Sequence, residues 1–99
     1  MLVKIGNGGR VDLYDDKGCF LRTIMRSGAI DADVRSDGMI VFTNQDGRVG
    51  LYDVRGCYLR TIVNHGAHSA RWSGNDVAVR LSDGRIGLYD DTGCYKRTI

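Results

Sequence analysis

The sequence contains no proline and no glutamate, and only five of its 99 residues are alanine. Alanine and glutamate are among the strongest helix formers, so their scarcity disfavours a helical fold. Glycine, by contrast, occurs 14 times, and valine, isoleucine, leucine, tyrosine and arginine recur along the chain. These residues are typical of strands separated by tight turns, and the sequence therefore predicts an all-β protein.

Long apolar runs and an excess of one charge are also missing. The 14 basic and 12 acidic residues give a net charge of +2 and are interspersed along the chain. This pattern does not indicate a nucleic-acid partner, and no window approaches the roughly 18 apolar residues of a membrane span. The first ten residues lack the apolar segment of a signal peptide. We expect a cytoplasmic protein without a membrane partner.

Three copies of one motif account for half of the chain. The segment "GRVDLYDDKGCFLRTI" at residues 9–24 returns as "GRVGLYDVRGCYLRTI" at 47–62 and as "GRIGLYDDTGCYKRTI" at 84–99. We divide this single repeat domain, residues 1–99, into an incomplete unit at 1–24 and full units at 25–62 and 63–99. Cys19, Cys57 and Cys94 occupy one repeat position, so their spacing of 37 or 38 residues measures the repeat and not a ligand pattern. We expect these thiols to be buried as small apolar groups.

Each full repeat contains four β-rich runs separated by turns of two or three residues. In the middle copy these runs are AIDADVR, MIVFTNQ, RVGLYD and CYLRTI. Asp-Gly between such runs predicts a two-residue type I′ hairpin, and it occurs at Asp37-Gly38, Asp46-Gly47 and Asp83-Gly84. The last turn of the repeat, which ends at Gly56 in the middle copy, predicts a three-residue hairpin closed by a left-handed glycine. Each full repeat is therefore predicted to be a four-stranded antiparallel meander.

The alternation of side chains makes both faces of these meanders apolar, as expected of identical sheets stacked around an axis. The repeats resemble those of WD40-type β-propellers. In that family the third strand ends in Trp-Asp, and here Tyr-Asp stands in its place, at Tyr14-Asp15, Tyr52-Asp53 and Tyr89-Asp90. The resemblance implies that each repeat is one propeller blade. Its motifs specify a fold and not a chemistry.

The first repeat lacks an inner strand, so the chain is predicted to hold about eleven strands, or two and three-quarter blades. Propellers typically close with four to eight blades. Two chains joined head to tail would give six, and we therefore predict a homodimeric six-bladed propeller. A β-trefoil, which also uses three four-stranded repeats, is the alternative, but the short repeat and the consecutive tight hairpins argue against it.

Two groups of charged residues are candidate ligand-binding sites. The inner strands differ most between the repeats, and their polar residues are predicted to line a central channel: Asp31, Asp33, His68 and Arg71. The other group recurs in every copy: Arg10, Arg48 and Arg85. Repeated arginines of this kind either form a ring of identical sites for an anionic ligand or pair with turn aspartates and neighbouring blades. Both interpretations stay open on the sequence alone.

We expect no metal, no cofactor and no enzymatic activity. The segment "DADVRSDG" from Asp31 is superficially similar to a calcium loop, but Phe42 stands where the bidentate glutamate would be. His65 and His68 have no third ligand nearby, and no nucleophile motif or phosphate-binding loop is present.

The predicted function is a non-catalytic interaction or scaffold module that docks a protein partner through its loops or channel face. This is the usual work of the family that the repeats resemble. The alternative is a ligand-binding propeller with repeated pockets at blades or blade interfaces, for a carbohydrate, a nucleotide or another anionic ligand. In both cases a second copy of the chain is an expected partner.

Overall fold

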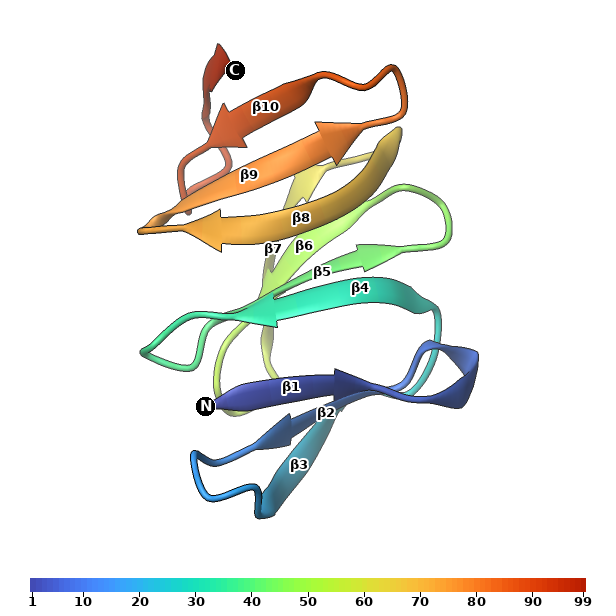
Figure 1. The fold of residues 1–99 in the computed structure, drawn as a ribbon, viewed down its shortest axis with the longest axis vertical. Helices are drawn as coiled ribbons and strands as arrows, with labels where there is room; N and C mark the ends of the chain where they lie inside the picture. Colours follow the sequence, from blue (N-terminus) through green and yellow to red (C-terminus); the bar gives the residue numbers. More distant parts are fainter.

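The computed structural model describes residues 1–99 and contains eleven strands in three antiparallel sheets, called blades here (Figure 1). Blade 1 comprises β1 (Leu2–Ile5), β2 (Val11–Tyr14) and β3 (Phe20–Met25), with the short 3₁₀ turn η1 (Asn7–Gly9) between its first two strands. Blade 2 comprises β4 (Ala29–Val34), β5 (Ile40–Asn44), β6 (Val49–Tyr52) and β7 (Tyr58–Val63). Blade 3 comprises β8 (Ala67–Ser73), β9 (Asp76–Leu81), β10 (Ile86–Tyr89) and β11 (Tyr95–Thr98). No helix in the structure is long and apolar enough to cross a membrane.

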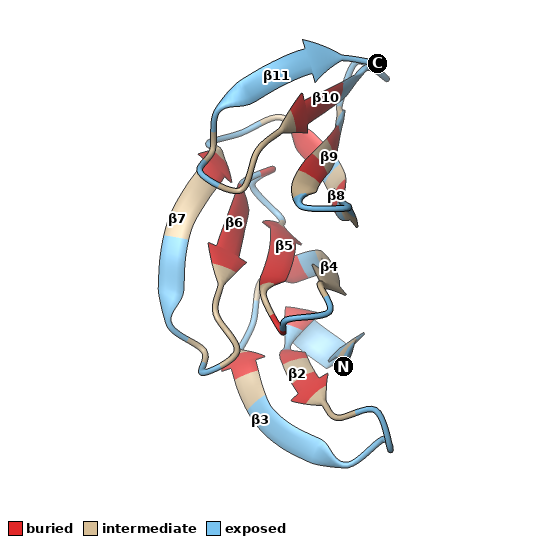
Figure 2. Cartoon of the chain, turned by 90° about the vertical axis from the view of Figure 1, so that its left-hand side faces the viewer, coloured by how far each residue is buried: buried red, intermediate tan, exposed pale blue.

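Strands that follow one another in sequence are neighbours within each blade, so every blade is a meander. Pairing registers place β1, β5 and β9 at equivalent positions, because Leu2, Ile40 and Val77 lie opposite the tyrosine of the next strand. Blade 1 has no equivalent of β4 or β8. In Figure 2 the inner strands lie close together and the outer strands β3, β7 and β11 are spread apart, like a fan. The predicted all-β blade arrangement is confirmed, and the trefoil alternative is wrong.

The core lies between the blades and not within any one of them. Four apolar side chains of blade 2 and four of blade 3 form one cluster: Val41, Val49, Leu51, Ile62, Ala67, Ala70, Val77 and Val79. A smaller cluster joins blades 1 and 2: Val11, Leu13, Ile24, Ala29 and Ile40. Period-two alternation sends neighbouring residues of β5 to opposite blades, as with Ile40 and Val41. Each fully buried side chain of this size contributes about 1.5–3 kcal/mol to folding.

The Asp-Gly turns differ from the prediction. No residue other than glycine has a positive φ, so Asp37, Asp46 and Asp83 do not adopt the type I′ conformation. The Gly47 amide donates to the Asn44 carbonyl over 3.0 Å, which makes this a type I turn closed by a left-handed glycine. The Asn44 side chain stabilises the turn by accepting from two backbone N–H groups. The inner hairpins therefore use the same three-residue form that was predicted for the outer ones.

Gly47 is also a point of close approach between two blades. Its φ is +81°, and a β-carbon there would stand 2.6 Å from the backbone nitrogen of Gly66. The backbone N–H of Ala67 donates to the Gly47 carbonyl over 3.0 Å across the same boundary. Only glycine allows this contact between the blade 2 turn and the start of β8.

The prediction of buried thiols is wrong, because Cys19, Cys57 and Cys94 are all exposed. Each follows the glycine of an outer hairpin, beyond the region that a neighbouring blade covers. The repeated contact is made by the cysteine backbone: the Cys57 N–H donates to Oδ1 of Asp53 over 2.9 Å. The backbone of the cysteine therefore helps to close a turn that is capped by an aspartate, and its thiol lies in solvent.

Candidate functional site

The inner strands β4 and β8 are joined by an ion pair between two of the predicted site residues. Nη1 of Arg71 donates to Oδ2 of Asp31 across the boundary between blades 2 and 3. This hydrogen bond, assisted by the negative charge of Asp33, raises the pKa of Arg71. The Arg71 side chain is 56% exposed, against 16% for Asp31, so the pair offers a guanidinium face to solvent.

Asp33 makes a second connection between the same strands. Its Oδ2 accepts a hydrogen bond of 2.9 Å from the backbone N–H of Trp72, and its Oδ1 accepts one of 3.0 Å from the N–H of Val34. The carboxylate thus accepts hydrogen bonds from backbone N–H groups of two blades. The structure brings Asp31, Asp33 and Arg71 together, and all three take part in contacts that join blades 2 and 3.

His68 forms no hydrogen bond with this group and is the extra residue of a β-bulge, a feature that both inner strands contain. The pairing of β4 with β5 shifts between Ala29 and Asp31, and the pairing of β8 with β9 shifts between Ala67 and Ser69. The extra residue at each bulge is exposed: Ile30 at 49% in β4 and His68 in β8. Bulges commonly turn a side chain out of a sheet in this way. No periodicity in the sequence indicated these two positions.

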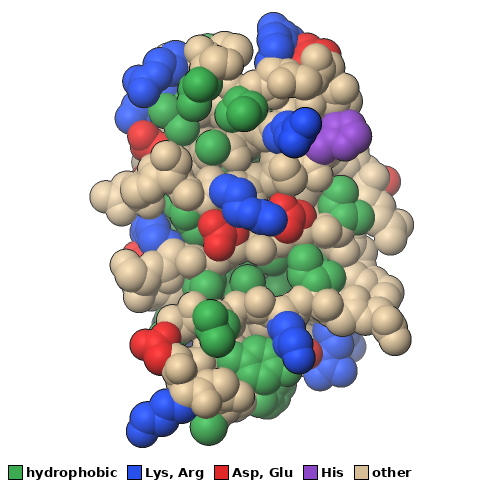
Figure 3. Space-filling model, viewed as in Figure 1, with side chains coloured by type: hydrophobic (Ala, Val, Ile, Leu, Met, Phe, Trp, Pro, Cys, Tyr) green, Lys and Arg blue, Asp and Glu red, His purple; other side chains and the backbone are tan.

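We call Ile30, Asp31, Asp33, His68 and Arg71 the inner-strand face. Figure 3, viewed from the side on which β1, β4 and β8 lie, shows acidic and basic side chains together near the middle of the molecule with apolar groups on either side. The surface is therefore mixed and not a patch of one charge, in agreement with the even charge distribution of the sequence.

The repeated arginines do not form a ring of identical sites. Nε of Arg10 donates to Asp12 over 2.9 Å, and Nε of Arg85 donates to Asp83 over 2.7 Å. Arg48 makes neither contact, because Gly50 stands at the position of Asp12 and Asp46 does not bond to it. Of the two interpretations that the sequence left open, pairing with nearby aspartates describes Arg10 and Arg85.

Trp72 marks a polar contact that the sequence did not indicate. Its indole Nε1 donates to the Met39 carbonyl over 3.1 Å, and the Arg35 guanidinium carbon lies 4.5 Å from the ring centre. Arg35 also pairs with Asp37 at 2.7 Å and, across the blade boundary, with Asp91 at 3.2 Å. The hydrogen bond from Arg35 lowers the pKa of Asp37 to about 2. Trp72 is half-buried and packs against the edge of the core.

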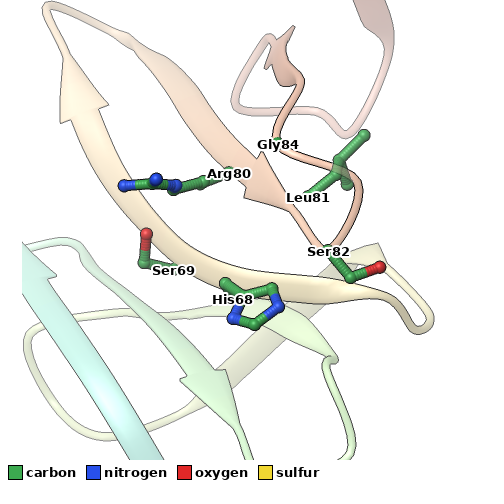
Figure 4. A pocket seen from close by; sticks show the side chains of 6 residues that line it. All are labelled: His68, Ser69, Arg80, Leu81, Ser82 and Gly84. Carbon is green, nitrogen blue, oxygen red and sulfur yellow. The ribbon is translucent and has the colours of Figure 1, made fainter.

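A hollow of about 330 Å³ lies beside β8, lined by His68, Ser69, Arg80, Leu81, Ser82 and Gly84 (Figure 4). In Figure 4 the Ser69 hydroxyl points toward the Arg80 side chain, whereas His68 projects from β8 in a different direction. Gly84 is the blade 3 equivalent of Gly47, but nothing lies within 4 Å of the place of its β-carbon. In blade 2 the equivalent place is filled by the start of β8, which packs against Gly47. In blade 3 no strand fills it, and the hollow lies there.

No protein-family model matches the sequence, and no curated protein matches it. Among solved structures, the chain is similar to the crystal structure of the Cps50 (Swd1) β-propeller domain of Myceliophteria thermophila, with a TM-score of 0.67 and 17% sequence identity. The match covers 96% of this chain and 36% of that domain. The chain therefore has the fold of part of a β-propeller and spans about a third of the length of the propeller it matches.

Proposed function

We propose that this protein is a non-catalytic interaction module that docks a protein partner on the inner-strand face. The observation that carries the proposal is the pair of bulges, which exposes Ile30 and His68 on the two strands that the Asp31–Arg71 pair joins. Arginine is enriched in protein interfaces, and here its half-exposed guanidinium lies on the same surface as an exposed apolar side chain and an imidazole.

The rigidity of this face supports the proposal. Asp31 fixes the Arg71 guanidinium, and Asp33 fixes the backbone at Trp72. Binding loses less conformational entropy when the contact groups are already held in place, so a preformed face retains more of its interaction energy as affinity. The resemblance to WD40-type repeats agrees with this function, because propellers of that family usually act as scaffolds.

Affinity capture with substituted proteins tests the proposal. We expect a double variant, His68→Ala with Arg71→Ala, to lose partners that the wild type retains. Arg85→Ala is the matched control, because this arginine is also exposed and ion-paired but lies outside the inner-strand face. Partners retained equally by the wild type, the double variant and the control would refute docking at this face.

A second candidate function, binding of a small anionic ligand, is favoured by the hollow beside β8. Arg80 supplies a positive charge there, and Ser69 and Ser82 supply hydroxyl groups. Calorimetric titration with ATP and with inorganic phosphate tests it, with Arg80→Ala compared against Arg85→Ala. Saturable binding that only the Arg80 variant loses would support this function, whereas absence of heat in the wild type would exclude it for these ligands.

A further inference from the structure

The boundary between blades 1 and 2 contains a polar and an apolar contact side by side. Nη1 of Arg22 on β3 donates to the Arg55 carbonyl, 3.4 Å away in the outer turn of blade 2. The Cδ1 methyl of Ile24 lies 3.7 Å from the place of a β-carbon on Gly56, in the same turn. An arginine and an isoleucine of one outer strand therefore hold the outer turn of the following blade.

The boundary between blades 2 and 3 repeats this arrangement. Nη1 of Arg60 on β7 donates to the Asp91 carbonyl in the outer turn of blade 3. The Cδ1 methyl of Ile62 lies 3.7 Å from the place of a β-carbon on Gly93. Ile24 and Ile62 are each only 8% exposed. One chain thus contains two junctions of this kind, with the acceptor carbonyl one position earlier in the turn of blade 3.

The outer strand of blade 3 contains the arginine and the isoleucine of a third junction, but there is no turn of a following blade for them to contact. Arg97 lies opposite Leu88 in the pairing register, as Arg60 lies opposite Leu51. Ile99 follows two residues later, as Ile62 follows Arg60, but it is 71% exposed. Two isoleucines at the same repeat position therefore differ about ninefold in exposure: Ile62 packs on the following blade and Ile99 does not.

Blade 1 carries the complementary acceptor half. Its outer turn, residues 15–18, has the same hydrogen bonds as the other two, with the Gly18 N–H donating to the Asp15 carbonyl over 3.1 Å. Nothing lies within 4 Å of the place of a β-carbon on Gly18, whereas an isoleucine methyl stands there for Gly56 and Gly93.

The sheet faces around these two halves are uncovered as well. On blade 3, Ile86 is 36% exposed at the position where Val49 is fully buried. On blade 1, Leu2 is 55% exposed at the position where Ile40 is fully buried. Such apolar groups on both end faces indicate surfaces built to be covered.

We propose that a second copy of this chain covers both faces, head to tail. Arg97 and Ile99 of each copy then contact the outer turn 15–18 of the other, in the junction that the chain already forms twice internally. A heterologous contact of this kind closes into a ring when the rotation between units allows it. Two copies give six blades, within the usual range of four to eight, whereas three copies would give nine.

Light scattering on the purified chain tests the assembly. We expect a mass twice the 10.9 kDa of the chain, about 22 kDa. Ile99→Asp on blade 3 and Leu2→Asp on blade 1 each place a charge in the proposed interface, and each should reduce the mass to that of one chain. The control is Leu59→Asp, because Leu59 is 37% exposed on the outer strand of the middle blade, away from both end faces.

Mixing the two variants distinguishes this arrangement from a dimer in which each end face packs against the same face of the other copy. The Ile99→Asp protein retains an intact blade 1 face and the Leu2→Asp protein an intact blade 3 face. An equimolar mixture should therefore form a heterodimer through the one junction that both substitutions leave unchanged. A folded wild type with the mass of one chain, a variant that stays dimeric, or folded variants that form no complex on mixing would each overturn the proposal.

A photo-reactive residue at position 99 of the otherwise unchanged protein gives an answer even if a charged variant fails to fold. We expect cross-links to residues 15–18 of a second chain, located by mass spectrometry. Cross-links between chains at any other segment would overturn the proposal.

Discussion

The Asp33 carboxylate accepts a hydrogen bond of 2.9 Å from the backbone N–H of Trp72, on the inner strand of the next blade. This contact joins blades 2 and 3, whose boundary also contains the Asp31–Arg71 and Arg35–Asp91 ion pairs beside the apolar cluster. It means that a side chain predicted to face a ligand also holds the scaffold together.

Replacing Asp33 by alanine should destabilise the protein by about 1.5–3 kcal/mol, because the Trp72 N–H loses a charged acceptor. Asp33→Asn retains an acceptor oxygen and should cost less. Urea unfolding at one fixed protein concentration measures both. Asp46→Ala is the control, because Asp46 is exposed in a turn, and it should change stability by less than about 0.5 kcal/mol. Equal effects of the Asp33 and Asp46 substitutions would mean that the Trp72 contact contributes nothing.

Stability should fall in acid partly through Asp37, whose pKa is lowered from 3.8 to about 2 by the hydrogen bond from Arg35. A carboxyl group with a lowered folded-state pKa stabilises the protein above its ordinary pKa, and this contribution is lost as the pH falls toward 2. Wild type should therefore exceed Asp37→Asn in unfolding free energy at pH 5, and the difference should shrink between pH 4 and pH 2. A difference that stays constant over this range would contradict the assignment.

The strands were predictable because alternation and glycine-ended turns are local features of the sequence. The Asp-Gly turn type was not, because Asp46-Gly47 suits both hairpin lengths and the Asn44 side chain decides between them. The exposure of Cys57 depends on how far the neighbouring blade extends over the outer hairpin, which no repeat spacing reveals. His68 and Arg71 are both exposed although they are three residues apart, because a bulge interrupts the alternation at His68, and no pattern in the sequence indicates this bulge.

All three cysteines should react with a thiol reagent in the native protein, because each is exposed. The number of thiols modified per chain, and the rate, should be similar with and without denaturant. A variant with serine at Cys19, Cys57 and Cys94 should keep wild-type stability within about 0.5 kcal/mol, as for other surface substitutions. Thiols that react only after unfolding would restore the buried role first expected for them.

Alanine substitutions at two equivalent glycines, Gly47 and Gly84, measure separately how much a left-handed backbone and crowding between blades each reduce the unfolding free energy. Gly47 and Gly84 have φ values of +81° and +90°, so alanine should cost each turn about 1–2 kcal/mol in backbone strain. At Gly47 the new methyl group would also stand 2.6 Å from the Gly66 nitrogen, whereas at Gly84 it would meet nothing within 4 Å. Overpacking of this kind typically adds about 1–3 kcal/mol, so Gly47→Ala should be the more destabilising by that amount in urea unfolding. Equal losses at the two sites would show that the blades can separate at this boundary without cost.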